Sequence, residues 1–386
     1  MKLVKSGLRT VDEQLGGGFL RPSSSILLSD RPTEKRMFAE NFLATGVKGK
    51  ESCIYIDFHR APSLARSHFK RYGVPDDSSL VIVDATSSQA MIPSSERYVI
   101  EDVTDMMDIR RVVQNAFEEQ RPKRVIVDSL EFLVDRFPHE EALKFWEFVN
   151  GLSTENNSVF FTLVTNWTLE RRELASLKDS ADAVLEFRTE RMGSSLLNLV
   201  RVSEIRKVEI ENNKWVPFKF EDLTGVVTYT PRILVIGSKD SGKEGFINSL
   251  CSRSIVDGEG HLSEGRDRRT IDVSDIETEV LGVPGKESFS ATLRLFIREM
   301  SGVFLVVNSS SLEDIENGRR IVEPDFGRVP LVVIANRRQM DGAFSEDEIR
   351  KRMKLSVDVP IIEFDEQGDG KAGKALQSLL KLPDDG

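Results

Sequence analysis

A short glycine-bearing segment in the second half of the chain has the residue types and the spacing that bind phosphate. Gly237, Gly242 and Lys243 stand at phosphate-loop spacing, and Asp240 and Ser241 lie inside the loop. Glycines allow backbone N–H groups to turn toward phosphate oxygens, and the lysine neutralises the outer phosphates. A plain glycine turn between a strand and a helix is the alternative interpretation. The pattern favours a nucleotide site with these residues as its contacts.

The elements around this loop are those that the motif requires, but one residue departs from it. The apolar run Ile233–Ile236 predicts a buried strand, and the spacing of Phe246 and Leu250 predicts a helix after the loop. Ser or Thr, whose hydroxyl holds Mg²⁺, is expected directly after Lys243, and Glu244 stands there instead. A carboxylate can bind Mg²⁺, yet it also repels phosphate. We interpret the site as built but altered, with Glu244 as a candidate metal ligand.

The composition is that of a globular protein of two or three domains with excess negative charge. The chain has 386 residues and a net charge of −10, whereas proteins that track along nucleic acids are more often basic. Nucleic acid is therefore an unfavoured partner. There is no apolar signal core at the N-terminus and no apolar run of membrane-spanning length, so we expect a cytoplasmic protein with no membrane span. Cys53 and Cys251 are predicted to be free thiols.

Strand and helix patterns alternate through the first half of the chain. The strands are mostly apolar, which is typical of a parallel sheet covered by helices on both faces. The stretches Leu196–Glu204 and Lys214–Phe220 predict an antiparallel pair that extends one edge of the sheet. Trp146 and Trp167 lie among apolar residues and are predicted to be core. The predicted strands of the main sheet are Ser25–Ser29, Ser52–Phe58, Leu80–Ala85, Arg124–Asp128, Ser158–Thr165 and Ala183–Phe187.

A second alternating series begins after the segment 221–231, where we place a domain boundary. The prediction is two α/β domains in tandem, residues 1–229 and 230–386. Residues 252–269 are polar and glycine-bearing, and they predict a long loop. The predicted strands of the second sheet are Ile233–Ile236, Ile276–Leu281, Val303–Asn308, Leu331–Ala335 and Pro360–Phe364.

Short matches to one known family run in order through residues 1–229. They are Ser6-Gly7-Leu8, Leu15-Gly16-Gly17-Gly18, Ile26-Leu27-Leu28, Phe42-Leu43-Ala44-Thr45-Gly46, Tyr55-Ile56-Asp57-Phe58 and Val125-Ile126-Val127-Asp128-Ser129-Leu130. On these residues the first domain resembles the KaiC branch of the RecA-like ATPases, and the last run matches the family's Walker B strand. The resemblance implies a RecA-like sheet, assembly through its edges, and a prokaryotic, in particular archaeal, source.

The residues that this family uses to bind phosphate are largely replaced. The family's loop needs glycine where Ser29 and Glu34 stand, and a hydroxyl where Arg36 stands. Lys35 alone is kept and is the remaining candidate phosphate contact. Because Glu34 places a negative side chain where backbone must approach phosphate, we expect no ATP hydrolysis from this domain.

The family's catalytic acids, one of which activates the attacking water, are also replaced. His59 and Arg60 stand in their places after the strand at Tyr55. Loss of a general base costs about 10²–10⁴-fold in rate. Asp128 remains and could hold Mg²⁺ through water, although a role as the polar end of a strand also explains it.

The second domain carries further motifs after its predicted strands, namely Gly282-Val283-Pro284-Gly285-Lys286 and Asn336-Arg337-Arg338-Gln339. With the glycine loop, these motifs are similar to those of small Ras-like GTPases, in particular prokaryotic ones of the gliding-motility type. The resemblance implies that Thr270 reaches Mg²⁺ and the terminal phosphate, that Gly285 contacts that phosphate, and that Asn336 contacts the base. A simple strand-end turn is an equal alternative for Asn336.

Several of these motif positions are altered. Lys286 replaces the glutamine that orients water, and Gly282 replaces an aspartate. Gln339 replaces the aspartate that accepts two hydrogen bonds from guanine, which leaves the choice of base open. We expect slow or absent hydrolysis and weak, metal-poor binding of GTP or ATP, with Glu244 and Thr270 as candidate Mg²⁺ ligands.

Two functions compete on these grounds. In the first, the protein is a regulatory or scaffold protein that binds a protein partner or itself and is not an efficient enzyme. In the second, the Ras-like half is a working GTPase that the KaiC-like half targets or oligomerises. A recombinase-like DNA accessory protein is a third reading by fold analogy alone, and the acidic charge argues against it.

Overall fold

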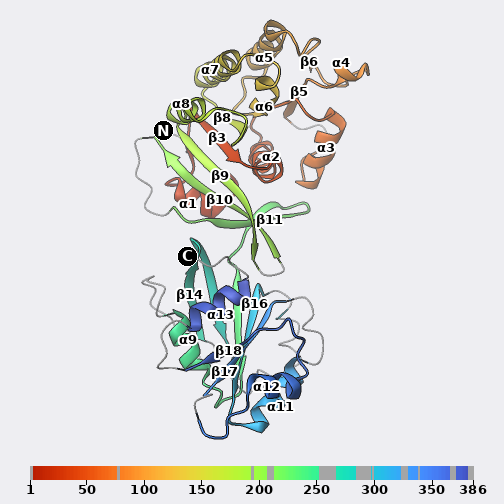
Figure 1. Cartoon of the computed structure of the whole chain (residues 1–386). Helices are drawn as coiled ribbons and strands as arrows, with labels where there is room; N and C mark the ends of the chain where they lie inside the picture. The colour runs from red at the N-terminus through yellow and green to blue at the C-terminus, as the bar shows by residue number, and fades with distance from the viewer. Residues whose placement is uncertain are drawn as a thin grey trace. The chain divides into compact units, whose positions relative to one another are not determined.

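The computed structural model of the chain forms two compact units (Figure 1). Contacts group Met1–Thr189 with Asn198–Tyr229, and Glu190–Leu197 with Thr230–Gly386. The described residues are 3–75, 79–192, 195–206, 213–251, 267–283, 297, 300–322, 329–337, 340–365 and 371–380.

The first unit is built on a sheet that is parallel at its centre and antiparallel at one edge. From β9 to β6 all neighbouring strands run parallel, whereas β10, β11 and β12 pair antiparallel at the edge. A small antiparallel pair, β1 (Leu3–Val4) and β2 (Phe19–Leu20), stands apart from it. The strand order is β12 (Gly225–Thr228), β11 (Val216–Glu221), β10 (Ser195–Ile205), β9 (Ala183–Met192), β3 (Ser23–Ser29), β8 (Val159–Thr165), β7 (Arg124–Asp128), β4 (Cys53–Asp57), β5 (Leu80–Asp84) and β6 (Tyr98–Val99).

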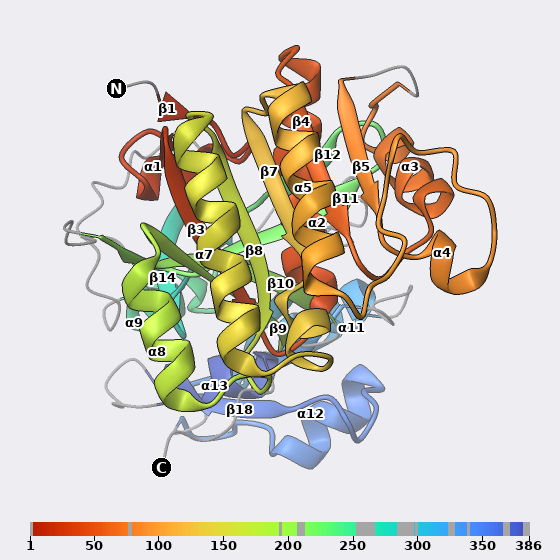
Figure 2. The ribbon, with the colours of Figure 1, turned by 90° about the horizontal axis from the view of Figure 1, so that it is seen from above.

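Helices cover both faces of this sheet, and each face has its own apolar core (Figure 2). One core includes side chains of α1 (Arg9–Gln14), α2 (Pro32–Lys48) and α3 (Pro62–Arg71). The other includes side chains of α5 (Met106–Gln120), α6 (Leu130–Val134), α7 (His139–Glu155) and α8 (Arg171–Ser180), while α4 (Ser87–Ala90) is a single turn.

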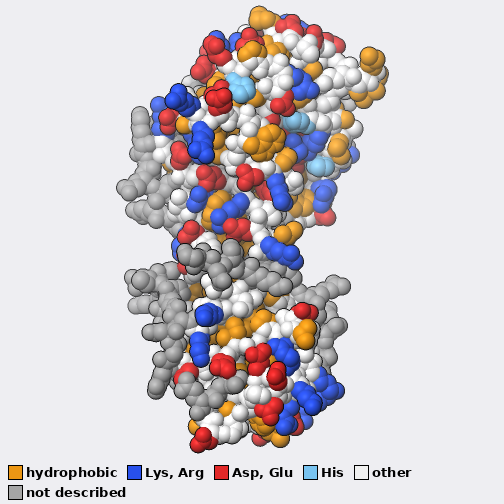
Figure 3. Space-filling model, viewed as in Figure 1, with side chains coloured by type: hydrophobic (Ala, Val, Ile, Leu, Met, Phe, Trp, Pro, Cys, Tyr) orange, Lys and Arg blue, Asp and Glu red, His pale blue; other side chains and the backbone are white. Residues whose placement is uncertain are grey.

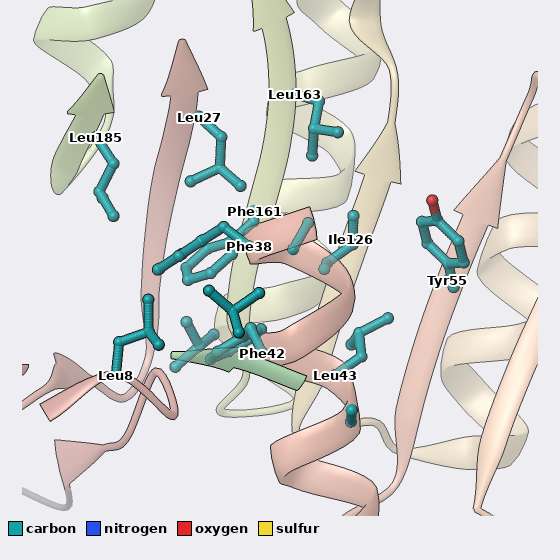
Figure 4. Packing of buried hydrophobic residues seen from close by; sticks show 14 of the residues in the cluster. Leu8, Leu27, Phe38, Phe42, Leu43, Tyr55, Ile126, Phe161, Leu163 and Leu185 are labelled. Atoms are coloured by element: carbon teal, nitrogen blue, oxygen red, sulfur yellow. The ribbon is translucent and has the colours of Figure 1, made fainter. Parts of the chain in front are cut away.

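Phenylalanines pack α2 against the centre of the sheet (Figure 4). The ring centroid of Phe161, on β8, lies 4.2 Å from that of Phe42 and 6.1 Å from that of Phe38, and both of these rings belong to α2. Full burial of one such side chain stabilises a fold by about 1.5–3 kcal/mol. Because α2 follows β3 directly in the chain, this packing fixes the position of the turn where the KaiC resemblance places phosphate.

The second unit has one antiparallel edge strand and is otherwise parallel. Its helices are α9 (Lys243–Cys251), α11 (Leu312–Val322), α12 (Glu346–Met353) and α13 (Lys371–Leu380). The strand order is β14 (Asp267–Val273), β15 (Ile276–Gly282), β13 (Arg232–Gly237), β16 (Gly302–Asn308), β17 (Leu331–Asn336) and β18 (Ile361–Phe364).

The predicted fold class is confirmed, since both units are α/β and the first carries the expected antiparallel edge. Two expectations were wrong. Residues 267–269, predicted as loop, belong to β14. This edge strand has a mostly polar sequence and buries the apolar side chains Ile271 and Val273. Trp167, predicted to be core, is 75% exposed because it lies in the turn after β8. Neither Cys53 nor Cys251 forms a disulfide, in agreement with the prediction. Among the described residues, no helix has both the length and the apolar character of a membrane span.

A capping box at the start of α12 gives a local test of the second unit. The Ser345 hydroxyl accepts the Glu348 N–H at 3.3 Å, and the Glu348 carboxylate accepts the Ser345 N–H at 2.8 Å. Ser345→Ala is expected to destabilise this helix by about 1 kcal/mol, whereas Ser345→Asp keeps the cap. Hydrogen exchange of α12 amides measures the difference, and equal protection in the two variants would contradict the assignment.

Candidate functional site

The turn between β3 and α2 is too short to wrap around phosphate. β3 ends at Ser29 and α2 begins at Pro32, so only residues 30–31 lie between strand and helix. Glu34, in the first turn of α2, is 4% exposed, and its carboxylate accepts a hydrogen bond from the Thr189 hydroxyl. A phosphate loop is a longer turn that points several backbone N–H groups at its ligand, and two residues are too few for such a turn.

Lys35, the kept lysine of this loop, is fully buried and bound inside the protein. Its Nζ donates to Glu131 Oε1 at 2.8 Å and to Thr165 Oγ1 at 2.7 Å. Burial lowers the pKa of Lys35, and the nearby Glu131 carboxylate partly offsets this effect. The structure therefore places Lys35 in a buried ion pair with Glu131, at the position where the KaiC resemblance predicts a phosphate contact.

Arg36 lies against the Walker B aspartate. Its Nε and Nη2 donate to the two oxygens of Asp128 at 2.5 Å and 2.9 Å, and the Tyr55 hydroxyl donates to Asp128 at 2.5 Å. Burial alone would raise the pKa of Asp128, but the hydrogen bonds and charge of Arg36 hold that pKa below its ordinary value. Asp128 is thus an ionised carboxylate with hydrogen bonds to both oxygens, at the position from which it would have approached Mg²⁺.

Arg60 extends this cluster of charges. Its Nε donates to Asp57 at 2.9 Å, its Nη1 donates to Glu40 at 2.6 Å, and its Nη2 donates to the Tyr55 hydroxyl. Burial and the neighbouring Asp128 raise the pKa of Asp57. The other replaced position, His59, has a ring nitrogen 2.9 Å from the Ser129 hydroxyl. The carboxylates of Asp57 and Glu40 are thus held in ion pairs with Arg60, whereas His59 is exposed beside Ser129.

The residues of this site do not fit Mg²⁺ with ATP. The aspartate that would approach the metal is occupied by Arg36, and the lysine is occupied by Glu131. Sequence reasoning identified the altered loop residues but not their partners. The sequence does contain a signal for the Arg36–Asp128 pair. Arg36 stands where the family has a Ser or Thr, while the Walker B residue Asp128 is retained.

The second unit retains a longer loop between strand and helix. β13 ends at Gly237 and α9 begins at Lys243, so residues 238–242 are free to turn. Gly242 has a φ of +83°, in the left-handed region that favours glycine. Ser241, also predicted as a contact, is buried, while Asp240 is exposed. This geometry can present backbone N–H groups to a phosphate.

Asn336 braces this loop. Its Nδ2 donates to the Ser241 carbonyl at 2.9 Å, and its Oδ1 accepts the Arg337 N–H at 2.9 Å. The side chain is buried at the end of β17, next to β16. Asn336 therefore supports the loop. The sequence interpretations of this residue, a base contact or a simple turn, did not include this role.

Lys243, the lysine of the second loop, can bind phosphate only after its ion pair with Glu244 breaks. Lys243 is 3% exposed and forms an ion pair with Glu244, whose side chain is 66% exposed. Burial would raise the pKa of Glu244, but the hydrogen bond from Lys243 lowers it below its ordinary value. Phosphate would therefore compete with Glu244 for Lys243.

Strand register does not bring Thr270 to this loop. Thr270 pairs with Glu279 across β14 and β15, and Glu279 pairs with Arg232 at the start of β13. Arg232 precedes Gly237 by five residues, which corresponds to roughly 17 Å of strand. Gly285, Lys286 and Gln339 lie outside the described residues. Of the two predicted metal ligands only Glu244 is at the loop, so Mg²⁺ has no described ligand set there.

A buried carboxylate that sequence reasoning missed lies at the start of α11. Asp314 accepts the Asn308 N–H at 2.6 Å and is 6% exposed. Burial raises its pKa, a hydrogen bond with Ser238 of the loop lowers it, and the charge of Asp240 raises it further. Negative side chains near the loop oppose the approach of a polyphosphate.

Comparison with known families places both units. The family model for the KaiC ATPases matches residues 4–233. The chain belongs to the KaiC ATPase family. A second family model, for the ADP-ribosylation factor family, matches residues 220–365. The chain thus combines a KaiC-like and an Arf-like domain, both of the P-loop NTPase type, which confirms the resemblances to the KaiC branch and to Ras-like GTPases.

The curated relatives match between about a third and about three fifths of this chain. A UPF0273 protein of Pyrococcus horikoshii is 32% identical over 134 residues, 33% of this chain and 54% of the relative. A UPF0273 protein of Aeropyrum pernix is 23% identical over 249 residues, 62% of this chain and 98% of the relative. The chain spans about half the length of the first curated relatives it matches. A solved KaiC-like protein of Pyrococcus horikoshii matches with 19% identity and a TM-score of 0.45, covering 59% of this chain and 99% of that protein.

Proposed function

We propose that this protein is a regulatory or scaffold protein in which the KaiC-like domain does not hydrolyse ATP. The observation that carries this proposal is the bidentate pairing of Arg36 with Asp128, which occupies the aspartate that would otherwise serve a metal. The loop before α2 is short and Lys35 is bound to Glu131, so phosphate and metal contacts are lost together. Docking of a protein partner, or of a second copy, is the function left to such a fold.

We place the domain boundary at residue 229, so that the KaiC-like domain is 1–229 and the Arf-like domain is 230–386. The turn after β12 and the start of β13 support this position. The match to the KaiC model ends at residue 233, close to it.

The Arf-like domain is proposed to bind GTP or ATP weakly and with little dependence on Mg²⁺. Gly237, Gly242 and Lys243 supply a loop that Asn336 supports, and these features favour phosphate binding. Glu244 opposes it, because its carboxylate pairs with Lys243 and stands where a metal-binding hydroxyl is expected. Binding in this form is suited to sensing nucleotide rather than to turnover.

Isothermal titration of the whole chain with GTP, GDP and ATP, with and without Mg²⁺, tests this proposal. We expect weak binding of at least one nucleotide that Mg²⁺ changes little and that Lys243→Ala abolishes. If Lys243→Ala leaves the binding unchanged, the loop 237–243 is not the nucleotide site.

Glu244→Ser provides the matched gain-of-function test. The substitution frees Lys243 and restores the hydroxyl at the metal position, and we expect nucleotide affinity to rise roughly tenfold in the presence of Mg²⁺. Glu244→Gln removes the charge without adding a metal ligand, so its gain is expected to be independent of Mg²⁺. Equal affinity of the wild type and Glu244→Ser in Mg²⁺ would contradict the role given to Glu244.

A working GTPase, targeted or oligomerised by the KaiC-like domain, is the second candidate. The observation that favours it is the intact bracing of the loop by Asn336. Release of phosphate from GTP that is lost in Lys243→Ala would support this candidate over the first.

A further inference from the structure

We infer that Arg36 is a permanent substitute for the divalent cation that a KaiC-type site places near its Walker B aspartate. This inference deepens the proposed function and rests on it. It states that the site at Asp128 stays free of metal because the chain carries its own cation, and that removal of this cation creates a divalent metal site.

The ion pair leaves neither carboxylate oxygen of Asp128 open to a metal ion. The guanidinium contacts both carboxylate oxygens of Asp128 at 2.5 Å and 2.9 Å, and the Tyr55 hydroxyl contacts one of them at 2.5 Å. The side chain of Asp128 is 1% exposed, whereas that of Arg36 is 21% exposed. A metal can therefore reach the carboxylate only by displacing the guanidinium.

The surrounding charges make a cation necessary at this point. Asp57 and Asp128 end the neighbouring parallel strands β4 and β7 at the same level of the sheet. Glu40 adds a third carboxylate, which forms an ion pair with Arg60. Without Arg36, the buried carboxylates would have Arg60 as the cation of this cluster, with its Nη2 3.9 Å from Asp128. Carboxylate oxygens of this kind are the ligands that Mg²⁺ and Mn²⁺ prefer.

Binding of Mn²⁺ alone to the full-length protein, followed by electron paramagnetic resonance, tests the inference. We expect Arg36→Thr to bind one more Mn²⁺ than the wild type, and the double variant Arg36→Thr with Asp128→Asn to lose that ion. Arg36→Lys keeps a cation in place and is expected to match the wild type. A folded Arg36→Thr protein that gains no Mn²⁺ would overturn the assignment.

A second measurement needs no substitution at Arg36 and so does not depend on the folding of that variant. All the tryptophans, Trp146, Trp167 and Trp215, precede residue 230, so tryptophan fluorescence reports the KaiC-like unit. We expect its thermal midpoint in the wild type to be equal in millimolar Mn²⁺ and in EDTA. A midpoint raised by Mn²⁺ in the wild type but not in Asp128→Asn would show metal at Asp128 and reject the inference.

Different results would contradict the proposed function and the assignment of Arg36 as the resident cation. Nucleotide turnover that Lys243→Ala abolishes contradicts the proposed function and leaves Arg36 as the resident cation. A Mn²⁺ ion bound at Asp128 in the wild type contradicts the Arg36 assignment, whatever the second domain does.

Discussion

Arg36→Ala is expected to destabilise the KaiC-like unit by about 3–5 kcal/mol, because it removes the bidentate ion partner of a buried carboxylate and leaves it with Arg60 at 3.9 Å. Asp128 is 1% exposed, and the other hydrogen bond that its carboxylate accepts from a described side chain comes from the neutral Tyr55 hydroxyl. Denaturant unfolding followed by tryptophan fluorescence measures this loss in the KaiC-like unit alone.

Two variants control for effects unrelated to the ion pair. Arg31 is exposed at the start of the same helix, and Arg31→Ala is expected to change stability by less than about 0.5 kcal/mol. Arg36→Met combined with Asp128→Leu removes both charges, and it should be less destabilising than Arg36→Ala alone. If Arg36→Ala is no more harmful than Arg31→Ala, the pair does not hold the site closed.

Gly242→Ala is expected to destabilise the Arf-like unit by about 2–4 kcal/mol, the sum of backbone strain and a lost loop support. The glycine has a φ of +83°, and a Cβ added there would lie 1.8 Å from Nδ2 of Asn336. The added methyl therefore displaces the side chain that donates to the Ser241 carbonyl.

Gly342 separates these two effects. It has a φ of +81°, and a Cβ added there would meet nothing within 4 Å, so Gly342→Ala carries strain without the collision. Residues 230–386 contain no tryptophan or tyrosine, and hydrogen exchange of their amides is the suitable measurement. Equal losses in Gly242→Ala and Gly342→Ala would show that Asn336 does not support the loop.

The fold could be predicted from the sequence because its signals are local. Apolar runs such as Ile233–Ile236 and Ser158–Thr165 mark buried strands wherever they pair, and the glycine loop marks the start of α9. β14 escaped prediction because an edge strand buries one face only, and Asp267–Val273 is polar enough to resemble a loop.

The candidate site could be predicted only in part, because its decisive contacts are not local. The loss of a hydroxyl at Arg36 can be read from the sequence, but its partner Asp128 is 92 positions away. Lys35 and Glu131 are separated by 96 positions. Thr270 matched a motif by residue type, whereas its distance from the loop is set by the register of β14, β15 and β13.

Release of phosphate from GTP and from ATP, each with Mg²⁺, by the purified full-length protein tests the central claim most directly. The account predicts that the wild type releases phosphate no faster than Lys35→Ala or Lys243→Ala. Turnover in the wild type that either lysine variant loses would contradict it.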